Sequence, residues 1–304
     1  AIAPPMTLPP PAETFRRLCC NPAVLDFASA TLTEAYCTAA PDHEQPMRAL
    51  MDAAFALLRT TAADPARFAT ALHTLSNDWF APGGSQPWFK AVYLDYKQRI
   101  KPPVRYARLD PHLRGQAVLD FGCGNGLTAL ILAQNGWQVQ LADVLDYRSP
   151  AARGLPFTPL GAETHLPYPD NAFDTALVFA VLHHVQPAAL LPLVGELRRV
   201  SRRVIVEEDS CGIPPGQPVP DDARLAAFMA LPLETQRQVI MLIDYFGNIL
   251  NQGIGEMDMP FGFKPVGEWQ TLFAAQGFTV TQTIVQGFQT GLFNQTCHIW
   301  FVLD

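Results

Sequence analysis

The chain has 304 residues, of which 49% are hydrophobic and 16% are charged, and its formal net charge is −7. This composition supports one large folded domain, or one domain with a smaller one, and disfavours a disordered chain. The acidic balance also argues against a general nucleic-acid-binding surface, which requires a stripe of basic residues.

The six cysteines form no C-x-x-C pair, so the sequence gives little support for a zinc site or a thioredoxin-type redox site. Cys19 and Cys20 are adjacent, which suits a reducing compartment better than a disulfide framework. We find no signal-peptide pattern and no apolar run near 18 residues. We therefore expect a cytoplasmic protein that acts without a membrane; the sequence leaves its oligomeric state open.

The first part of the chain, residues 1–87, is predicted to be a helical N-terminal extension. Asn21-Pro22 and Asp64-Pro65 each combine a helix-capping residue with a proline suited to the first helical turn. Apolar residues at helical spacing follow both pairs. The extension is either a bundle that packs on itself or a lid over an active site, and the two interpretations are compatible.

A further helix is predicted from Trp88 to Leu109, leading into the first strand. Its aromatic face includes Tyr93 and Tyr96. These tyrosines are either ordinary core residues or contacts to a substrate or cofactor that the helix covers.

The stretch that begins at Gln116 reads as a short buried strand, a glycine-rich turn and then a helix from Leu127 to Asn135. Three glycines at alternate positions of the turn allow a tight backbone and a close approach to a ligand. The helix N-terminus presents unpaired N–H groups above the turn. These features indicate a nucleotide-like ligand on an α/β sheet.

Within this stretch, residues 120–126 read D-F-G-C-G-N-G and resemble the first motif of the class I S-adenosylmethionine-dependent methyltransferases, D-x-G-C-G-x-G, of the methyltransferase type 11-like group. A carboxylate beside the turn suits the cationic amino group of the methionine moiety and would repel a pyrophosphate. The resemblance implies that the following residues bind the cofactor: Asp120, Gly122, Cys123, Gly124 and Asn125.

The nicotinamide pattern G-x-G-x-x-G fits less well. Started at Gly122, it needs a glycine where the chain has Leu127. Started at Gly124, it is satisfied by Ala129 in its last position, so a dehydrogenase remains an alternative.

The second strand is predicted over Gln138–Asp143. An acid at the carboxyl end of such a strand can accept hydrogen bonds from both ribose hydroxyls, so Asp143 is the ribose candidate, with Val144 beside it and Asp146 as the weaker choice. The other interpretation of Asp143 is a surface acid in a loop.

Residues 161–174 are similar to the family segment G-D-A-x-x-L-P-F-P-D-x-x-F-D, which faces the adenine. The usual acid is replaced here by Ala162, and the nearest acid is Glu163. The resemblance therefore places Glu163 and Thr164 at the adenine, with a shift of one residue.

The fourth strand, Phe173–Val181, is apolar throughout, as expected for a parallel strand buried on both faces. The resemblance places Phe179 and Ala180 against the cofactor. Just beyond the strand, His184 matches the family's histidine and His183 precedes it. Each histidine is a candidate general base near neutral pH, or else a brace for its loop.

The fifth strand ends in three acids, Glu207-Glu208-Asp209, at the edge where open α/β sheets bind ligands. The cluster could orient a substrate, with Asp209 as our candidate, or hold a divalent metal, or simply form a solvated strand end. We assign no metal ligand.

Residues 211–260 are predicted to form a helical insertion that caps the substrate. Asp244 and Asn248 lie four apart and share a helical face, as substrate contacts or as a polar outer surface. The later W-x-x-L-F and G-F residues, between Trp269 and Phe278, resemble the family's last helix and turn. The two final strands follow, and in the family the last one is antiparallel.

Together these features predict a Rossmann-like α/β domain over residues 88–304, with a seven-stranded methyltransferase sheet, a helical N-terminal extension and a helical insertion before the last two strands. The predicted function is transfer of a methyl group from S-adenosyl-L-methionine, giving S-adenosyl-L-homocysteine, to O, N or C of a small molecule. No nucleic acid is expected as a partner. The alternatives are a nucleic-acid or protein methyltransferase, and a non-catalytic cofactor-binding module.

Overall fold

The computed structural model describes residues 21–161, 164–248, 259–288, 293 and 295–304. The chain divides into two compact units. One contains the described parts of Ala1–Tyr96, Asp209–Pro265 and Gln286–His298, and we call it the helical unit. The other contains Lys97–Glu208, Val266–Val285 and Ile299–Asp304, and we call it the sheet unit.

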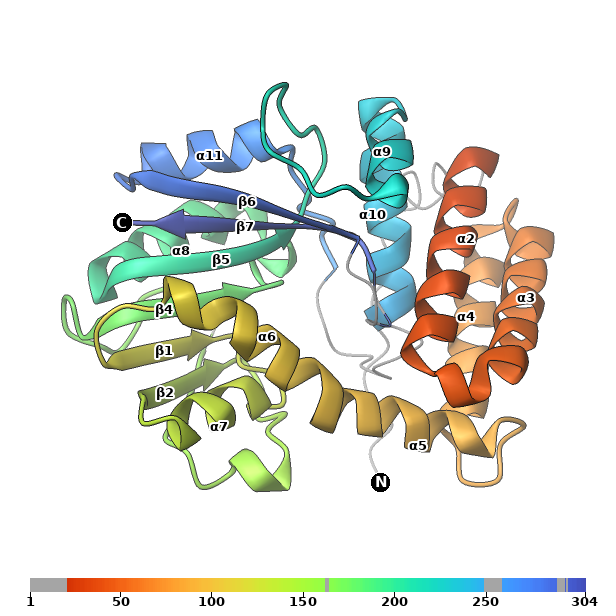
Figure 1. Cartoon of the computed structure of the whole chain (residues 1–304), viewed down its shortest axis with the longest axis horizontal. Coiled ribbons are helices and arrows are strands. Elements are labelled where there is room, and N and C mark those ends of the chain that lie inside the picture. The colour runs from red at the N-terminus through yellow and green to blue at the C-terminus, as the bar shows by residue number, and fades with distance from the viewer. Residues whose placement is uncertain (1–20, 162–163, 249–258, 289–292, 294) are drawn as a thin grey trace. The chain divides into compact units, whose positions relative to one another are not determined.

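The seven-stranded sheet has the strand order β3-β2-β1-β4-β5-β7-β6 (Figure 1). Its strands are β1 (Ala117–Phe121), β2 (Gln138–Asp143), β3 (Phe157–Pro159), β4 (Phe173–Phe179), β5 (Ser201–Asp209), β6 (Val280–Phe288) and β7 (Cys297–Leu303). Strands β1 to β5 pair in parallel. The predicted Rossmann-like α/β fold with seven strands is confirmed.

The last strand runs against its neighbours. Asp304, just after β7, exchanges backbone hydrogen bonds of 3.0 and 2.7 Å with Thr279, just before β6. Its carboxylate also binds the guanidinium of Arg203 near the start of β5. The end of β7 therefore meets the starts of β5 and β6, which is the antiparallel arrangement expected from the resemblance.

Helices cover both faces of the sheet in the sheet unit (Figure 1). They are α6 (Lys101–Leu109), α7 (Leu127–Gln134), α8 (Pro187–Val200) and α11 (Val266–Ala275), with short turns η3 (Asp110–His112), η4 (Pro150–Ala152) and η5 (Leu182–His184). A buried apolar cluster joins the sheet to α6 and α7; it consists of Leu109, Val118, Leu132, Leu177, Ile205 and Trp300. On α11, Trp269 and Phe273 are fully buried, and Phe273 packs against Phe301 of β7.

The helical unit combines segments that are far apart in the sequence. Its helices are α2 (Pro22–Ala39), η1 (Pro41–His43), α3 (Glu44–Thr61), α4 (Pro65–Phe80), α5 (Pro87–Asp95), α9 (Ala223–Met229) and α10 (Leu233–Phe246). The predicted caps form: Asn21 accepts a hydrogen bond from Ala23 N, and Asp64 accepts from the N–H groups of two residues in the first turn. Helix α10 packs on α2, and Phe246 stacks on Phe55 of α3 with ring centroids 5.3 Å apart.

The helix expected to run from Trp88 to Leu109 is interrupted. A π-helical turn, η2 (Tyr96–Ile100), separates α5 from α6. Two prolines, Pro102 and Pro103, follow the turn. Because proline has no N–H to donate to the preceding turn, the regular hydrogen-bond ladder cannot continue through this point.

Among the described helices, none has both the length and the hydropathy that crossing a membrane requires.

The amino-terminal edge of the sheet is held by a carboxylate. Asp174 Oδ2 accepts hydrogen bonds from the backbone N–H groups of Gln116 (2.8 Å) and Ala117 (3.0 Å), and Oδ1 binds Arg202 at 2.6 Å. These donors lower the pKa of Asp174, the backbone bonds most of all. Asp174 therefore ties the start of β4 to the start of β1.

We expect Asp174→Asn to lower the free energy of unfolding by about 1 kcal/mol at neutral pH, because the amide cannot make charge-assisted bonds. A depressed folded-state pKa adds stability that is present above the unfolded pKa and is lost as pH falls through the folded one. The difference from wild type should therefore be smaller at about pH 3 than at about pH 7. Urea unfolding at both pH values measures it. Asp170→Asn, at an exposed ion pair, is the control, and an equal loss at both pH values would contradict the assignment.

Candidate functional site

The glycine-rich turn after β1 has the backbone geometry that its sequence predicts. Gly122, Gly124 and Gly126 have φ values of 71°, 53° and 70°, in the left-handed region that side chains disfavour. The N–H of Gly122 binds the carbonyl of Ala142 in β2 at 2.8 Å, which fixes the turn to the neighbouring strand.

The three glycines differ in what surrounds them. A Cβ on Gly122 would lie 2.4 Å from Val181 Cγ2, and one on Gly126 would lie 2.9 Å from Ala152 Cβ. A Cβ on Gly124 would meet no described atom within 4 Å. The outer glycines are therefore required by packing, whereas Gly124 borders open space in which a ligand can approach the backbone.

Asp143 joins this turn to the end of β2. Its Oδ2 accepts a hydrogen bond from Gly124 N at 2.9 Å, and its Oδ1 accepts from Val144 N at 2.7 Å. Burial raises the pKa of Asp143 by more than the backbone donors lower it. A carboxylate oxygen can accept more than one hydrogen bond, so Asp143 keeps acceptor capacity for a ribose. Asp146, in contrast, forms an ion pair with Arg148 at 2.8 Å.

Asp120 is buried at the end of β1, with 6% of its surface exposed. Among the residues that the structure describes, no group donates a hydrogen bond to its carboxylate. Burial raises the pKa of Asp120 to about 7, with Arg105 lowering it and Asp143 raising it. A buried carboxylate without a donor is costly, and a bound ammonium group would satisfy it.

Phe179, at the end of β4, lies in a cluster that sequence analysis did not detect. Its ring stacks on Trp300, with centroids 5.3 Å apart, and the guanidinium of Arg105 lies 5.0 Å from its centre. Glu207 binds both partners, accepting from Arg105 at 2.9 Å and from Trp300 Nε1 at 2.6 Å. This cluster fixes Phe179 beside the strand end; Arg105 has no sequence signal that would have identified it.

The turn after β4 carries the two candidate histidines. Ala180 has a φ of 56°, which is strained for a residue with a side chain. The backbone N–H groups of Val181 and Leu182 donate to Glu208 Oε1 at 3.2 and 2.7 Å. His183 Nδ1 lies 2.6 Å from Glu208 Oε2. His184 is half-buried, with its ring centroid 4.2 Å from that of His183.

The three acids at the end of β5 do not act as a cluster. Glu207 binds Arg105 and Trp300, and Glu208 binds the histidine turn. In the helical unit, Asp209 lies 2.7 Å from His298 Nδ1. Because successive side chains of a strand point to opposite faces, neighbouring acids in the sequence have separate partners.

The remaining predicted cofactor residues lie near these strand ends, or outside the described residues. Cys123, Asn125 and Thr164 are half-buried, and Val144 is 62% exposed, as an apolar side chain at a ligand surface can be. Asn125 Oδ1 accepts from Leu127 N at the start of α7. Glu163 lies outside the described residues, so its adenine role stays a prediction.

The other predicted substrate contacts belong to the helical unit. Tyr93 and Tyr96 are buried in an aromatic cluster around Phe293, with centroids 5.6 and 4.7 Å from its ring. Asn248 donates a hydrogen bond of 2.8 Å to Asp244, as their shared helical face implies. Substrate binding by these residues, and by Asp209, stays a prediction.

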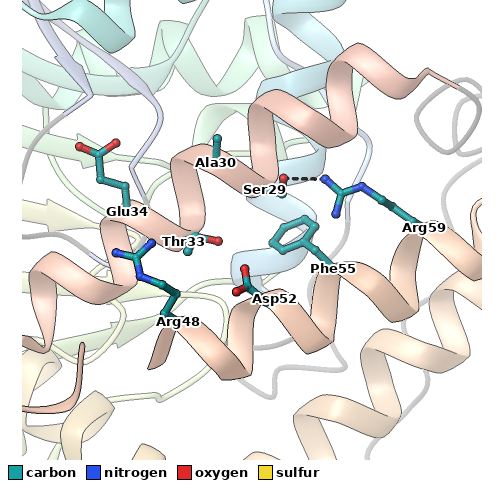
Figure 2. A pocket seen from close by; sticks show the side chains of 8 residues that line it. All are labelled: Ser29, Ala30, Thr33, Glu34, Arg48, Asp52, Phe55 and Arg59. Atoms are coloured by element: carbon teal, nitrogen blue, oxygen red, sulfur yellow. Dashed lines mark hydrogen bonds between the residues drawn. The ribbon is translucent and has the colours of Figure 1, made fainter. Parts of the chain in front are cut away.

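A pocket of about 690 Å³ lies between α2 and α3 of the helical unit (Figure 2). Its charged side chains are largely paired: Arg59 binds Ser29 and Asp26, Arg48 binds Glu44, and Glu34 binds Arg224. The pocket contains none of the predicted site residues.

The strand ends of the sheet unit thus fit the cofactor that the sequence indicates. Asp120 offers a buried anion for the methionine ammonium group, Gly124 leaves room for close approach, and Asp143 offers acceptors for the ribose. The fold and this site together indicate a class of protein: an α/β domain suited to a cationic nucleoside at the carboxyl ends of parallel strands.

Comparison with known proteins finds a family match within the sheet unit. Residues 119–203 match the family described as "Methyltransferase domain". The prediction of a class I S-adenosylmethionine-dependent methyltransferase domain, with S-adenosyl-L-methionine as its cofactor, is confirmed for this part.

One curated relative is ECU09_1500 of Encephalitozoon cuniculi (strain GB-M1), a protein named as a methyltransferase. It is 36% identical over 90 residues, which span 29% of this chain and 41% of the relative. The chain therefore matches less than half the length of this relative.

Two solved structures are also similar. A SAM-dependent methyltransferase from Methanosarcina mazei is 17% identical, with a TM-score of 0.45 over 64% of this chain and 95% of its own. A geranyl diphosphate C-methyltransferase from Streptomyces coelicolor A3(2) is 12% identical, with a TM-score of 0.48 over 75% of this chain and 83% of its own. Likenesses this distant do not bear on the acceptor.

We expect Gly124→Ala to weaken binding of S-adenosylhomocysteine at least about tenfold, because the new methyl group occupies the ligand's space. The matched control is Gly136→Ala, since Gly136 also has a positive φ (91°) and open surroundings but follows α7. Both variants should lose about 1 kcal/mol of stability from the backbone strain. Calorimetric titration distinguishes them; equal affinities for the two variants would contradict a ligand at Gly124.

Asp120→Asn should have opposite effects on binding and stability. Since the folded-state pKa of about 7 lies above the ordinary aspartate value of 3.8, ionising Asp120 destabilises the fold as pH rises between these values. The variant should therefore be more stable than wild type near about pH 8, yet bind S-adenosylhomocysteine more weakly because the ammonium group loses its anion.

Near about pH 5, where Asp120 is protonated in the folded protein, the two affinities should approach each other, and the stability advantage of the variant should be smaller than near about pH 8. Thermal unfolding and calorimetry at both pH values measure these differences. A pH-independent affinity in the wild type would refute the ammonium assignment.

Proposed function

We propose that the chain is an S-adenosylmethionine-dependent methyltransferase that acts on a small-molecule acceptor. The observation that carries the proposal is the buried carboxylate of Asp120, without a donor among the described residues, beside a turn whose central glycine borders open space. When bound, S-adenosylmethionine supplies a methyl group already activated by its positive sulfur. The protein's contribution is therefore alignment, exclusion of water and removal of a proton.

Methyl transfer to an acceptor that carries a proton requires one base. The acceptor's oxygen or nitrogen forms the new bond to the methyl carbon, and the carbon–sulfur bond breaks with its electrons going to sulfur. For an acceptor that carries a proton, that proton passes to a base of the protein. We propose His183 or His184 in this role, because an imidazole changes charge near neutral pH.

The proposal also specifies that the acceptor is a small molecule. The net charge of −7 does not favour a nucleic-acid substrate. We propose that acceptor recognition belongs to the helical unit, which combines the predicted N-terminal extension and the predicted cap. The two segments share one core: α10 packs on α2, and Asn21 donates a hydrogen bond of 3.0 Å to Gln238.

Within that unit, the predicted acceptor contacts are Tyr93, Tyr96, Asp209, Asp244 and Asn248. Their aromatic and carboxylate character suits a small, partly apolar molecule with a polar group. A nucleic-acid or protein methyltransferase, or a binding module without turnover, would share the same cofactor site. An assay of which molecules become methylated distinguishes these alternatives.

The cofactor is tested by calorimetry with S-adenosylhomocysteine and with NAD. We expect binding of the former alone. Asp143→Ala should weaken it by roughly 1–3 kcal/mol, the contribution of two ribose hydrogen bonds. Asp146→Ala, which changes the neighbouring acid paired with Arg148, should leave it unchanged. Binding of NAD instead would refute the proposal.

The acceptor is tested by incubating the protein with a labelled methyl donor and cell extract separated by size. Label in the small-molecule fraction supports the proposal. Label only in protein or nucleic acid contradicts the small-molecule part, and label in no fraction, with S-adenosylhomocysteine bound, supports a binding module.

A further inference from the structure

The contact between His183 and Glu208 is buried. The two side chains are 1% and 0% exposed, and Nδ1 lies 2.6 Å from Oε2. Two further His–carboxylate contacts are more exposed. In the contact between His165 and Glu196, the histidine side chain is 72% exposed. In the contact between His298 and Asp209, it is 13% exposed.

The hydrogen bonds of Glu208 identify which partner carries the proton. Its Oε1 accepts two backbone N–H groups, from Val181 and Leu182. Hydrogen bonds from N–H donors favour the ionised form of a carboxylate. An ionised carboxylate only accepts, so Nδ1 of His183 must be the donor. In a neutral imidazole the other nitrogen, Nε2, is then the one that takes up a proton.

The same carboxylate fixes the place of the histidine. It holds the strained turn that begins at Ala180, whose own N–H binds the carbonyl of Glu207 at 2.8 Å. The side chain of Val181 fills the space over Gly122, where a Cβ would be 2.4 Å away. The histidine turn therefore packs directly on the glycine turn that binds the cofactor.

We propose that Glu208 is a positioning residue that holds His183 in the tautomer with a proton on Nδ1, so that Nε2 is the atom that receives the acceptor's proton during methyl transfer. The role of Nε2 as a base rests on the proposed function, methyl transfer. The inference selects His183 over His184 as that base. After transfer, the imidazolium carries its positive charge next to the carboxylate of Glu208, which stabilises it.

The proposal is tested by determining the tautomer of His183 by NMR of protein with ¹⁵N-labelled histidine. The measurement is made at about pH 8, above the ordinary pKa of an imidazole. Couplings between ring protons and nitrogens distinguish the two tautomers, and the His183→Gln variant assigns the signal. We expect Nδ1–H for His183. A proton on Nε2, or on both nitrogens, overturns the proposal.

Glu208→Gln then tests the cause. The amide oxygen can still accept from the turn, whereas its NH₂ group donates to Nδ1, so the tautomer should reverse to Nε2–H. An unchanged tautomer overturns the role of Glu208. Asp174→Asn is the matched control, because Asp174 also accepts two backbone N–H groups next to β4; it should lose stability and leave the His183 signal unchanged.

The tautomer that NMR detects for His183 does not depend on whether the proposed function is correct. If S-adenosylhomocysteine fails to bind while His183 shows the expected tautomer, the methyltransferase proposal fails and the positioning role stands. With an acceptor, Glu208→Gln should lower kcat by about 100-fold while leaving the KM for S-adenosylmethionine unchanged. If Glu208→Gln lowered kcat and raised the KM for S-adenosylmethionine by similar factors, the result would indicate general damage to the fold. It would then contradict a role specific to His183.

Discussion

A carboxylate buried without a hydrogen-bond donor is the constraint around which the site of the sheet unit is arranged. Asp120 stands at the end of a central parallel strand, where desolvation raises its pKa to about 7. Such a group destabilises the empty protein and is stabilised by a cation that enters the site. The sheet tolerates this cost because its neighbours are satisfied: Asp143 holds the glycine turn, and Glu207 holds Arg105 and Trp300. Asp120 is therefore the residue that we propose to face the positive group of the ligand.

The same edge of the sheet stores backbone strain at a second position. Ala180 adopts a conformation that glycine would adopt more easily, and Glu208 holds the residues that follow it. A glycine there would relieve the strain but loosen the turn that carries His183. Strain at Ala180, the missing donor at Asp120 and the positive φ of Gly124 all lie at the ends of β1 and β4. The positions that reduce the stability of the fold therefore coincide with the places where the proposed chemistry needs fixed geometry.

Local signals allowed much of this to be predicted. The caps at Asn21 and Asp64, the alternate glycines and the acid at the end of β2 depend on a few adjacent residues, and the structure confirms their geometry. The pairing of His183 with Glu208 depends on β4 and β5 being neighbours in register, with Phe179 opposite Glu207. Sequence alone shows three consecutive acids there; only the alternation of the strand separates their roles. Arg105 could not be found at all, because its partners Phe179 and Glu207 come from β4 and β5. The π-helical turn before α6 was missed because apolar spacing continues through it, although Pro102 and Pro103 carried the signal.

The division of the chain explains why its cofactor is easier to predict than its acceptor. The predicted cofactor residues lie at or just after strand ends in one continuous part of the sequence, so each is recognisable from its flanking strand. The helical unit is assembled from three separate parts of the chain, and its core joins residues such as Asn21 and Gln238 across 217 positions. Amphipathic spacing predicts each helix but not its partner, because any apolar helical face can pack against another. If acceptor selection resides in this unit, the information that specifies it lies in long-range packing, which leaves no compact motif to read.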